Sequence, residues 1–186
     1  VEWVDIPSPR MGFRENNRDG DGVVTQGLDA GGSSFISLEG CVCIDGQVYF
    51  TSKYGGRAKS GSVYQYDIDR ERIRMVYESP GHHVFSGPDN IVMSPRGSLV
   101  LCEDRVSQNT AGQNIAGLTA DGDLFRFCQV NPELSGEYLG HDLAKTALHS
   151  EWAGVCFSAD GQWMFVNLFN PGATLAITGP WQQGLI

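Results

Sequence analysis

The stretch GPDNIVMSPRGSLVLCED, residues 87–104, decides how the rest of the chain is interpreted. It contains a tight turn, a short apolar strand, a Pro/Gly turn, and a second apolar strand that ends in two carboxylates. Because the two ends of a hairpin lie side by side, Asp89, Asn90, Glu103 and Asp104 are expected to converge at one end of a sheet. Carboxylates at such short distances from one another repel unless protons or cations neutralise them. The stretch therefore predicts a cation site, in which Glu103 and Asp104 would be outer ligands.

The pattern of this hairpin recurs at two other places in the chain. Asp45 and Gly46 form one further turn between apolar strands, and Asp160 and Gly161 form another. Each copy extends over roughly 40–60 residues, a spacing typical of β-propeller blades. The predicted fold is therefore all-β, made of four-stranded antiparallel meanders that form about three blades, at 34–80, 86–135 and 150–186.

The remaining segments are expected to connect or precede these blades. Residues 1–33 are predicted to form a leading strand, over residues 1–6, and a polar loop, and a short helical insertion is predicted near 137–150. Since a closed ring needs about four to eight blades, the chain is predicted to be part of a propeller. Open edge strands favour pairing with another chain, so the expected partner is a missing N-terminal half or a second chain.

The charge of the chain limits the kind of partner it can have. A net charge of −9 argues against nucleic acid or an anionic membrane as the main partner. An anionic substrate stays compatible with this charge, because bound cations can reverse the local field. No apolar run approaches the roughly 20 residues that a membrane-spanning helix needs. The five cysteines lie in apolar strand segments and are expected to be small buried hydrophobes.

Acidic residues occupy the same position, at the start of the innermost strand, in all three repeats. They are Glu39, Asp89 with the following Asn90, and Glu151. In a propeller the innermost strands line the central channel, so these side chains would face one another across a common funnel. Oxygen ligands without histidine suit a hard cation such as Ca²⁺, or Fe³⁺ where the site is strongly anionic. The sequence therefore predicts a metal site formed by these four residues.

Several motifs give the chain a family resemblance. In order, they are LEG at 38–40, GQVYFT at 46–51, PDN at 88–90, SPRG at 94–97 and EWAGVCFSADG at 151–161. Together they resemble the C-terminal half of PhoX-type alkaline phosphatases. The resemblance implies a six-bladed propeller in the periplasm or outside the cell, usually exported in folded form by the twin-arginine route. It also implies hydrolysis of small phosphate esters at a cluster of Ca²⁺ and Fe³⁺, with Glu39, Asp89 and Glu151 as metal ligands and catalytic residues.

The sequence departs from the family pattern at two positions near this site. Ser37 stands where the family commonly has a phosphate-binding arginine, and Asn170 stands where it has a histidine before Pro-Gly. Arg57, Arg96 or Arg105 is expected to supply the missing positive charge, with Asn170 as a further substrate contact. Ligands that the family takes from its N-terminal half, including a cysteine, do not occur in this chain.

Two alternatives to a phosphatase follow from the same residues. The two departures favour a catalytically inactive propeller that acts as a calcium-binding or structural interaction module. A calcium-dependent, lactonase-like propeller hydrolase also uses acidic and asparagine ligands around its channel, and Asn90 and Asn170 fit that pattern. Comparing turnover of phosphomonoesters with turnover of lactones would separate the two hydrolases.

Overall fold

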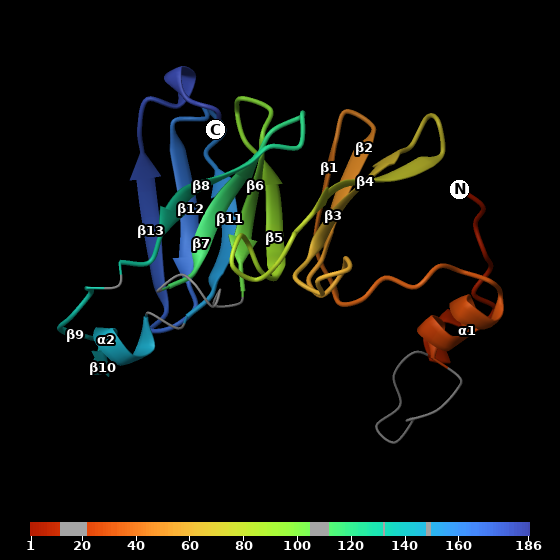
Figure 1. The fold of residues 1–186 in the computed structure, drawn as a ribbon, viewed down its shortest axis with the longest axis horizontal. Helices are drawn as coiled ribbons and strands as arrows, with labels where there is room; N and C mark the ends of the chain where they lie inside the picture. The colour runs from red at the N-terminus through yellow and green to blue at the C-terminus, as the bar shows by residue number, and fades with distance from the viewer. Residues whose placement is uncertain (12–21, 105–111, 132, 148–149) are drawn as a thin grey trace. The chain divides into compact units, whose positions relative to one another are not determined.

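A computed structural model describes residues 1–11, 22–104, 112–131, 133–147 and 150–186 of the chain (Figure 1). The chain divides into two compact units, Val1–Phe35 and Ile36–Ile186. No helix among the described residues is both long and apolar enough to cross a membrane. The predicted all-β fold is confirmed for the second unit, whose main elements are antiparallel sheets.

The described part of the first unit differs from the prediction of a leading strand, and residues 12–21 of the predicted polar loop lie outside the described residues. Its described residues form the 3₁₀ helix η1 (Pro9–Met11) and the helix α1 (Val23–Asp29), and residues 1–6 form no strand. A strand needs a neighbour for its backbone hydrogen bonds, and the described part of this unit contains no other strand. After α1, Gly31 adopts a φ of 89°, and the amides of Gly31 and Gly32 bond to the carbonyls of Leu28 and Gly27. This Schellman motif ends the helix.

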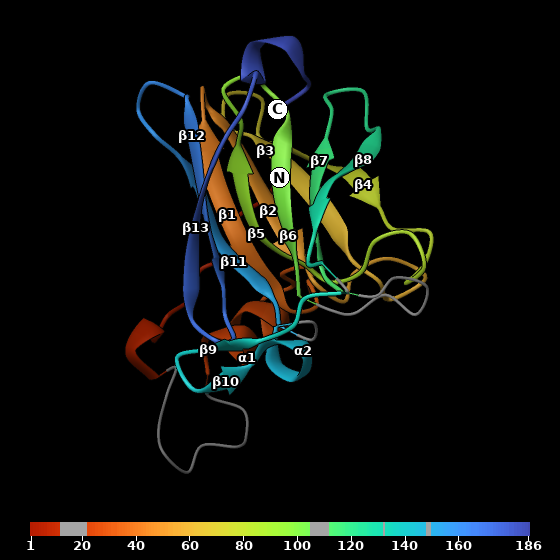
Figure 2. The ribbon, with the colours of Figure 1, turned by 90° about the vertical axis from the view of Figure 1, so that its left-hand side faces the viewer.

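The second unit contains three antiparallel meander sheets, in which every strand pairs with its neighbour in the sequence (Figures 1 and 2). The first sheet has the strands β1 (Leu38–Ile44), β2 (Gln47–Ser52), β3 (Ser62–Asp67) and β4 (Arg72–Glu78). The second has β5 (Pro88–Met93), β6 (Leu99–Glu103), β7 (Asn114–Leu118) and β8 (Leu124–Gln129). The third has β11 (Trp152–Phe157), β12 (Trp163–Leu168) and β13 (Ala173–Thr178).

The third sheet has three strands in the described part of the chain, whereas the repeat predicts four. After β13, Gly179 and Pro180 lead into the 3₁₀ helix η2 (Trp181–Gln183). Proline has no backbone N–H to donate to a neighbouring strand, which favours this ending. Between the second and third sheets lie the small hairpin of β9 (Glu137–Tyr138) and β10 (His141–Asp142) and the helix α2 (Leu143–Thr146).

Hydrophobic clusters pack against both faces of the second sheet. Leu99 and Leu101 of β6 belong to the cluster shared with the first sheet, while Val100 and Cys102 belong to the cluster shared with the third. Successive side chains on a strand point to opposite faces, so a strand buried on both faces must be apolar at consecutive positions. The packing places β5 next to both β1 and β11, so the first strands of the three sheets follow one another in the order β1, β5, β11.

The cysteines divide into two groups. Cys102 is buried and Cys128 is half-buried, as expected, and burial raises the pKa of the Cys102 thiol to about 12 and that of Cys128 to about 11. For Cys41, Cys43 and Cys156 the expectation of burial is wrong, since all three are exposed. These three lie on β1 and β11, and at their positions no other described part of the chain covers the strand.

Each first strand carries an irregularity in its pairing close to its acidic residue. The register shifts between Leu38 and Cys41 in β1, between Pro88 and Ile91 in β5, and between Ala153 and Cys156 in β11. A β-bulge bends the strand and redirects side chains, and bulges are common beside active sites. The repeat seen in the sequence is therefore also a repeat of local backbone distortion at one end of the three sheets.

Candidate metal centre

Three carboxylates from separate segments of the second unit meet at this end of the sheets. Asp89, Asp104 and Glu151 each offer one carboxylate oxygen, and these oxygens lie within 4.8 Å of one another. Asp89 is the second residue of β5, Asp104 directly follows β6, and Glu151 directly precedes β11. All three side chains are half-buried. We call this group the acidic triad.

The hairpin of β5 and β6 brings Asp89 and Asp104 together as the sequence predicts. Pro88 at the start of β5 pairs with Glu103 at the end of β6, and the Asp104 amide donates to the carbonyl of Gly87 at 2.9 Å. Glu151 is held by the third sheet, because its carbonyl accepts a hydrogen bond from the Phe169 amide at 3.1 Å, just beyond β12. The triad therefore depends on both the hairpin and the packing of the second sheet on the third.

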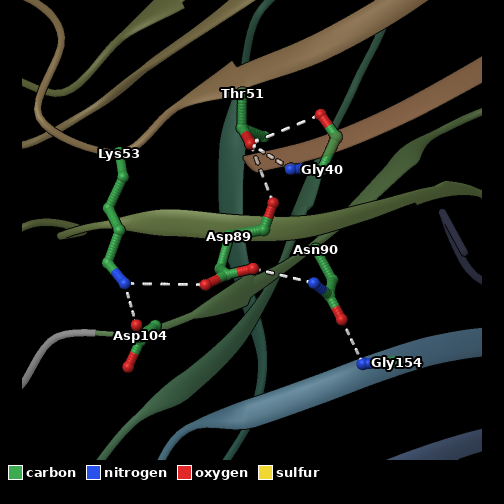
Figure 3. A network of polar contacts seen from close by, with 7 residues as sticks. All are labelled: Gly40, Thr51, Lys53, Asp89, Asn90, Asp104 and Gly154. Carbon is green, nitrogen blue, oxygen red and sulfur yellow. Dashed lines mark hydrogen bonds and ion pairs between the residues drawn. The ribbon is translucent and has the colours of Figure 1, made fainter. Parts of the chain in front are cut away.

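A lysine that is not among the predicted site residues lies against the triad. The Lys53 ammonium forms an ion pair with Oδ2 of Asp104 and lies 3.6 Å from Oδ2 of Asp89 (Figure 3). The three side chains are only 12% to 22% exposed. Lys53 directly follows β2, and its amide donates to the carbonyl of Ser37 at 2.8 Å. The sequence offers no signal for this role, because a lysine at the end of a strand is usually solvated.

Thr51 ties the first sheet to Asp89. Its hydroxyl donates to the Asp89 backbone carbonyl at 2.8 Å and accepts a hydrogen bond from the Gly40 amide at 2.9 Å (Figure 3). The Thr51 side chain is fully buried. Gly40 allows this close approach, because a Cβ at its position would lie 2.4 Å from the Asp89 carbonyl oxygen and 2.8 Å from the Ile91 amide nitrogen. The bulge of β1 is therefore packed directly on the backbone that carries Asp89.

Asn90, a predicted metal ligand, is engaged in bonds to the protein. Its side-chain amide donates to Oδ1 of Asp89 at 2.7 Å, and its side-chain oxygen accepts a hydrogen bond from the Gly154 amide in β11 (Figure 3). The side-chain oxygen is the atom that a cation would bind. In this arrangement Asn90 orients Asp89 and joins the second sheet to the third.

Glu103, a predicted outer ligand, is directed away from the triad. It is fully buried and accepts hydrogen bonds from the Ser86 amide at 2.8 Å, the Asn114 amide at 2.9 Å and the Asn114 side chain at 2.5 Å. Burial raises the pKa of Glu103 to about 7, and the hydrogen bonds from Asn114 and Ser86 oppose that rise. The structure therefore separates Glu103 from Asp104, contrary to the expectation that both would be outer ligands, because side chains of consecutive residues along a strand alternate in direction.

None of the other predicted site residues that the structure describes belongs to the acidic triad. Glu39 is exposed on β1. The exposed Arg57 donates its backbone amide to Glu78 at 2.6 Å, while Arg96 lies in the turn between β5 and β6, at the far end of β5 from Asp89. Arg105 lies outside the described residues. Asn170 is exposed, and its amide donates to the hydroxyl of Ser150, next to Glu151.

The chemistry of these side chains fits a hard cation. Three carboxylates against one ammonium leave a formal charge of −2, from three negative charges and one positive charge, in a half-buried position. Carboxylate oxygens are the ligands that Ca²⁺ prefers, and separate segments of a chain allow the variable geometry that it tolerates. The residues present are therefore suited to hold one such ion, with further ligands to complete its coordination.

Comparison with known proteins identifies a family that this chain matches. The family model described as alkaline phosphatase PhoX matches residues 1–172. A comparison with curated proteins found no match. Among solved structures, a protein from Bacteroides uniformis, provisionally named as a 6-phosphogluconolactonase, is similar with 16% sequence identity and a TM-score of 0.45. That match covers 80% of this chain and 40% of the other, so the chain spans less than half of that protein's length.

Proposed function

The chain belongs to the alkaline phosphatase PhoX family, and on that premise we propose that it carries metal ligands of a phosphomonoester hydrolase. The family is metal-dependent, and this chain brings three carboxylates together where a cation would bind. The acidic triad is the observation that carries the proposal, because its members come from separate parts of the sequence. Its substrates would be small phosphate esters.

In this proposal the three sheets are blades of a β-propeller. Two features support it. The first strand of the second sheet lies next to the first strands of the other two sheets, and each first strand has its acidic residue and its bulge at the same end. A ring of six blades would require further blades, from an N-terminal half or from a second chain. The proposed location is the periplasm or the extracellular space, reached by the twin-arginine route, since members of this family are typically exported.

The residues of the chain have distinct tasks in the proposed site. Asp89, Asp104 and Glu151 hold the cation, and Glu39 adds a further carboxylate from the equivalent position of β1. Asn90 fixes the orientation of Asp89 through its bonds to Oδ1 and to the Gly154 amide. Ca²⁺ suits the triad, and Fe³⁺ is the second cation proposed for the assembled, strongly anionic site.

Bound cations supply the positive charge that a phosphate ester requires. They would polarise its phosphoryl oxygens and orient an oxygen nucleophile in line with the scissile bond. The chain itself is acidic, so a phosphate ester is repelled from the triad until cations reverse the local field. The proposal therefore predicts strict dependence of turnover on added metal.

The test is turnover of p-nitrophenyl phosphate by the full-length protein purified without chelator, with its metal content measured on the same sample. The variant Asp104→Asn is expected to lower turnover by about 10–100-fold, because it removes a ligand charge. Asp121→Asn, in the exposed turn between β7 and β8, is the matched control and should leave turnover unchanged. Equal turnover of the wild type and the Asp104 variant would contradict the proposal.

A second candidate function is a calcium-binding propeller without catalytic activity. The observation that favours it is Ser37, a neutral side chain at a position where the matched family commonly has an arginine. Bound Ca²⁺ together with no turnover of any phosphomonoester by the full-length, metal-loaded protein would favour this candidate over the hydrolase.

A further inference from the structure

Lys53 contacts two members of the acidic triad through oxygen atoms that a cation would also use. Its ammonium pairs with Oδ2 of Asp104 and lies 3.6 Å from Oδ2 of Asp89. Both carboxylates belong to the group whose oxygens lie within 4.8 Å of one another. An ammonium ion and a metal cation at these oxygens are therefore alternative partners, because each is attracted by the same negative charge and each excludes the other by repulsion.

The backbone around Lys53 is held firmly in place. The Lys53 amide donates to the Ser37 carbonyl at 2.8 Å, and the hydroxyl of the preceding Ser52 donates to the Ile36 carbonyl at 2.6 Å. Thr51 bonds to the backbone of Asp89. Three consecutive residues thus fix the base of the Lys53 side chain relative to the triad, whereas its four-carbon stem can still rotate the ammonium toward or away from the carboxylates.

Because this ion pair is partly buried, its electrostatic attraction is stronger than that of a surface pair. The Lys53 side chain is 12% exposed, and its partners are 18% and 22% exposed. Exposed ion pairs contribute little because water screens them, but screening is weaker where side chains are mostly covered. Removing one partner of a covered pair also leaves the other without compensation. Loss of the Lys53 charge should therefore strengthen the attraction of the triad for a cation.

We propose that Lys53 sets the cation affinity of the acidic triad by competing with the metal for Asp89 and Asp104. The inference rests on the proposed function in that it takes the triad as the cation site. Binding of a metal ion displaces the ammonium from the two carboxylates, so the site fills only above a cation concentration that Lys53 determines. Lys53 is in this sense a regulator of occupancy and not a metal ligand.

Titration of the full-length protein with Ca²⁺, followed by calorimetry, tests this competition. Lys53→Met is expected to bind Ca²⁺ about tenfold more tightly than the wild type, since a competing charge has been removed. Lys53→Gln, which keeps polar atoms near the carboxylates, should also bind more tightly and serves if the methionine variant does not fold. Lys53→Arg retains the charge and should not bind more tightly than the wild type.

Lys145 offers a matched control for the change in net charge. It is an exposed lysine of α2 that pairs with Asp142 at 2.9 Å, so Lys145→Met removes the same charge and a solvent-exposed ion pair. Its Ca²⁺ affinity should stay within about twofold of the wild type, as expected for screened surface charges. A tenfold gain in Ca²⁺ affinity in both Lys53→Met and Lys145→Met would mean that net charge alone explains the effect, and it would overturn the proposal.

Thermal unfolding gives a second readout that needs no activity. In chelator, Lys53→Met should unfold at a lower temperature than the wild type, because Asp89 and Asp104 then lack their partner. Saturating Ca²⁺ should raise its unfolding temperature by more than that of the wild type. Unchanged or weaker Ca²⁺ affinity of the Met and Gln variants, or no Ca²⁺ binding by any variant, overturns the role of Lys53.

Turnover of p-nitrophenyl phosphate on the same samples separates this inference from the proposed function. Tighter Ca²⁺ binding by Lys53→Met without any phosphatase turnover supports the competition and contradicts the hydrolase. Metal-dependent turnover with identical Ca²⁺ affinity in wild type and variant supports the hydrolase and contradicts the competition.

Discussion

The side-chain oxygen of Asn90 accepts a hydrogen bond from the backbone amide of Gly154 and so joins β5 to β11. The amide group of the same side chain donates to Oδ1 of Asp89 at 2.7 Å (Figure 3). One residue thus connects the packing of two sheets with the orientation of a carboxylate in the triad. The geometry of the candidate metal centre therefore depends on contacts between sheets as well as on the hairpin that first suggested it.

Replacing Asn90 by alanine should weaken both the fold and the cation site. The change leaves the Gly154 amide without its acceptor and Asp89 without its donor, so the free energy of unfolding should fall by about 1–3 kcal/mol. Urea unfolding in chelator measures this loss, and Ca²⁺ titration should give a lower affinity. Asn131→Ala, at an exposed residue whose side chain bonds only locally to the Glu133 amide among its described contacts, is the control and should change neither quantity appreciably.

Replacing Gly40 by alanine should separate β1 from β5. The new Cβ would lie 2.4 Å from the Asp89 carbonyl oxygen, and a backbone atom cannot move aside as a flexible side chain can. The free energy of unfolding should fall by about 1–3 kcal/mol. At Gly179 the nearest atom to a new Cβ is 3.9 Å away, so Gly179→Ala is the comparison. Equal unfolding midpoints for the two variants would refute the close contact at Gly40.

Glu103 should make stability fall as pH rises from about 4.5 to about 7. Burial raises its pKa from 4.5 to about 7 in the folded protein. Within this window the folded state retains a proton that the unfolded chain has released, so the unfolded state is favoured progressively as pH increases. The full loss above pH 7 is on the order of 3 kcal/mol.

Urea unfolding at several pH values, in chelator, measures this dependence. Glu103→Gln cannot ionise, so the part of the slope due to Glu103 should vanish between pH 4.5 and 7. A slope that is the same in the wild type and the variant would contradict the raised pKa.

The cysteines should react in two classes. Cys41, Cys43 and Cys156 are exposed and should be modified by a thiol reagent in the native chain at pH 8. Burial raises the pKa of Cys102 to about 12 and that of Cys128 to about 11, which keeps both as unreactive thiols until the protein unfolds. Peptide mapping by mass spectrometry after labelling distinguishes the sites. Rapid native labelling of Cys102 would contradict the packing of the second sheet on the third.

The parts of the fold that depend on local signals could be predicted from the sequence. Turn residues and period-two apolar patterns mark the hairpins, and the hairpin of β5 and β6 places Asp89 beside Asp104 as expected. The repeat pointed to Glu151 as the third acidic residue, and the predicted family is confirmed. The hairpins and their acidic residues follow from the residue types within a few positions of each turn, and the family follows from the order of the motifs along the chain.

The parts that depend on contacts between sheets could not be predicted in the same way. Lys53 reaches the triad only because β2 ends beside the start of β5, and nothing near it in the sequence distinguishes it from a surface lysine. The burial of Glu103 follows from the packing of β6 and β7, although the alternation of side chains along β6 already implied that Glu103 and Asp104 face opposite ways. The helix α1 was missed because glycine interrupts it and no side chain caps its N-terminus.

The most direct test of the central claim is to locate a bound cation at the acidic triad. Crystals of the full-length protein grown with Ca²⁺, measured with long-wavelength X-rays, would give an anomalous difference map. We expect a Ca²⁺ peak about 2.3–2.6 Å from carboxylate oxygens of Asp89, Asp104 and Glu151, with the Lys53 ammonium moved away from it. An ordered, Ca²⁺-saturated crystal with no peak between these carboxylates, and with Lys53 still paired to Asp104, would contradict it.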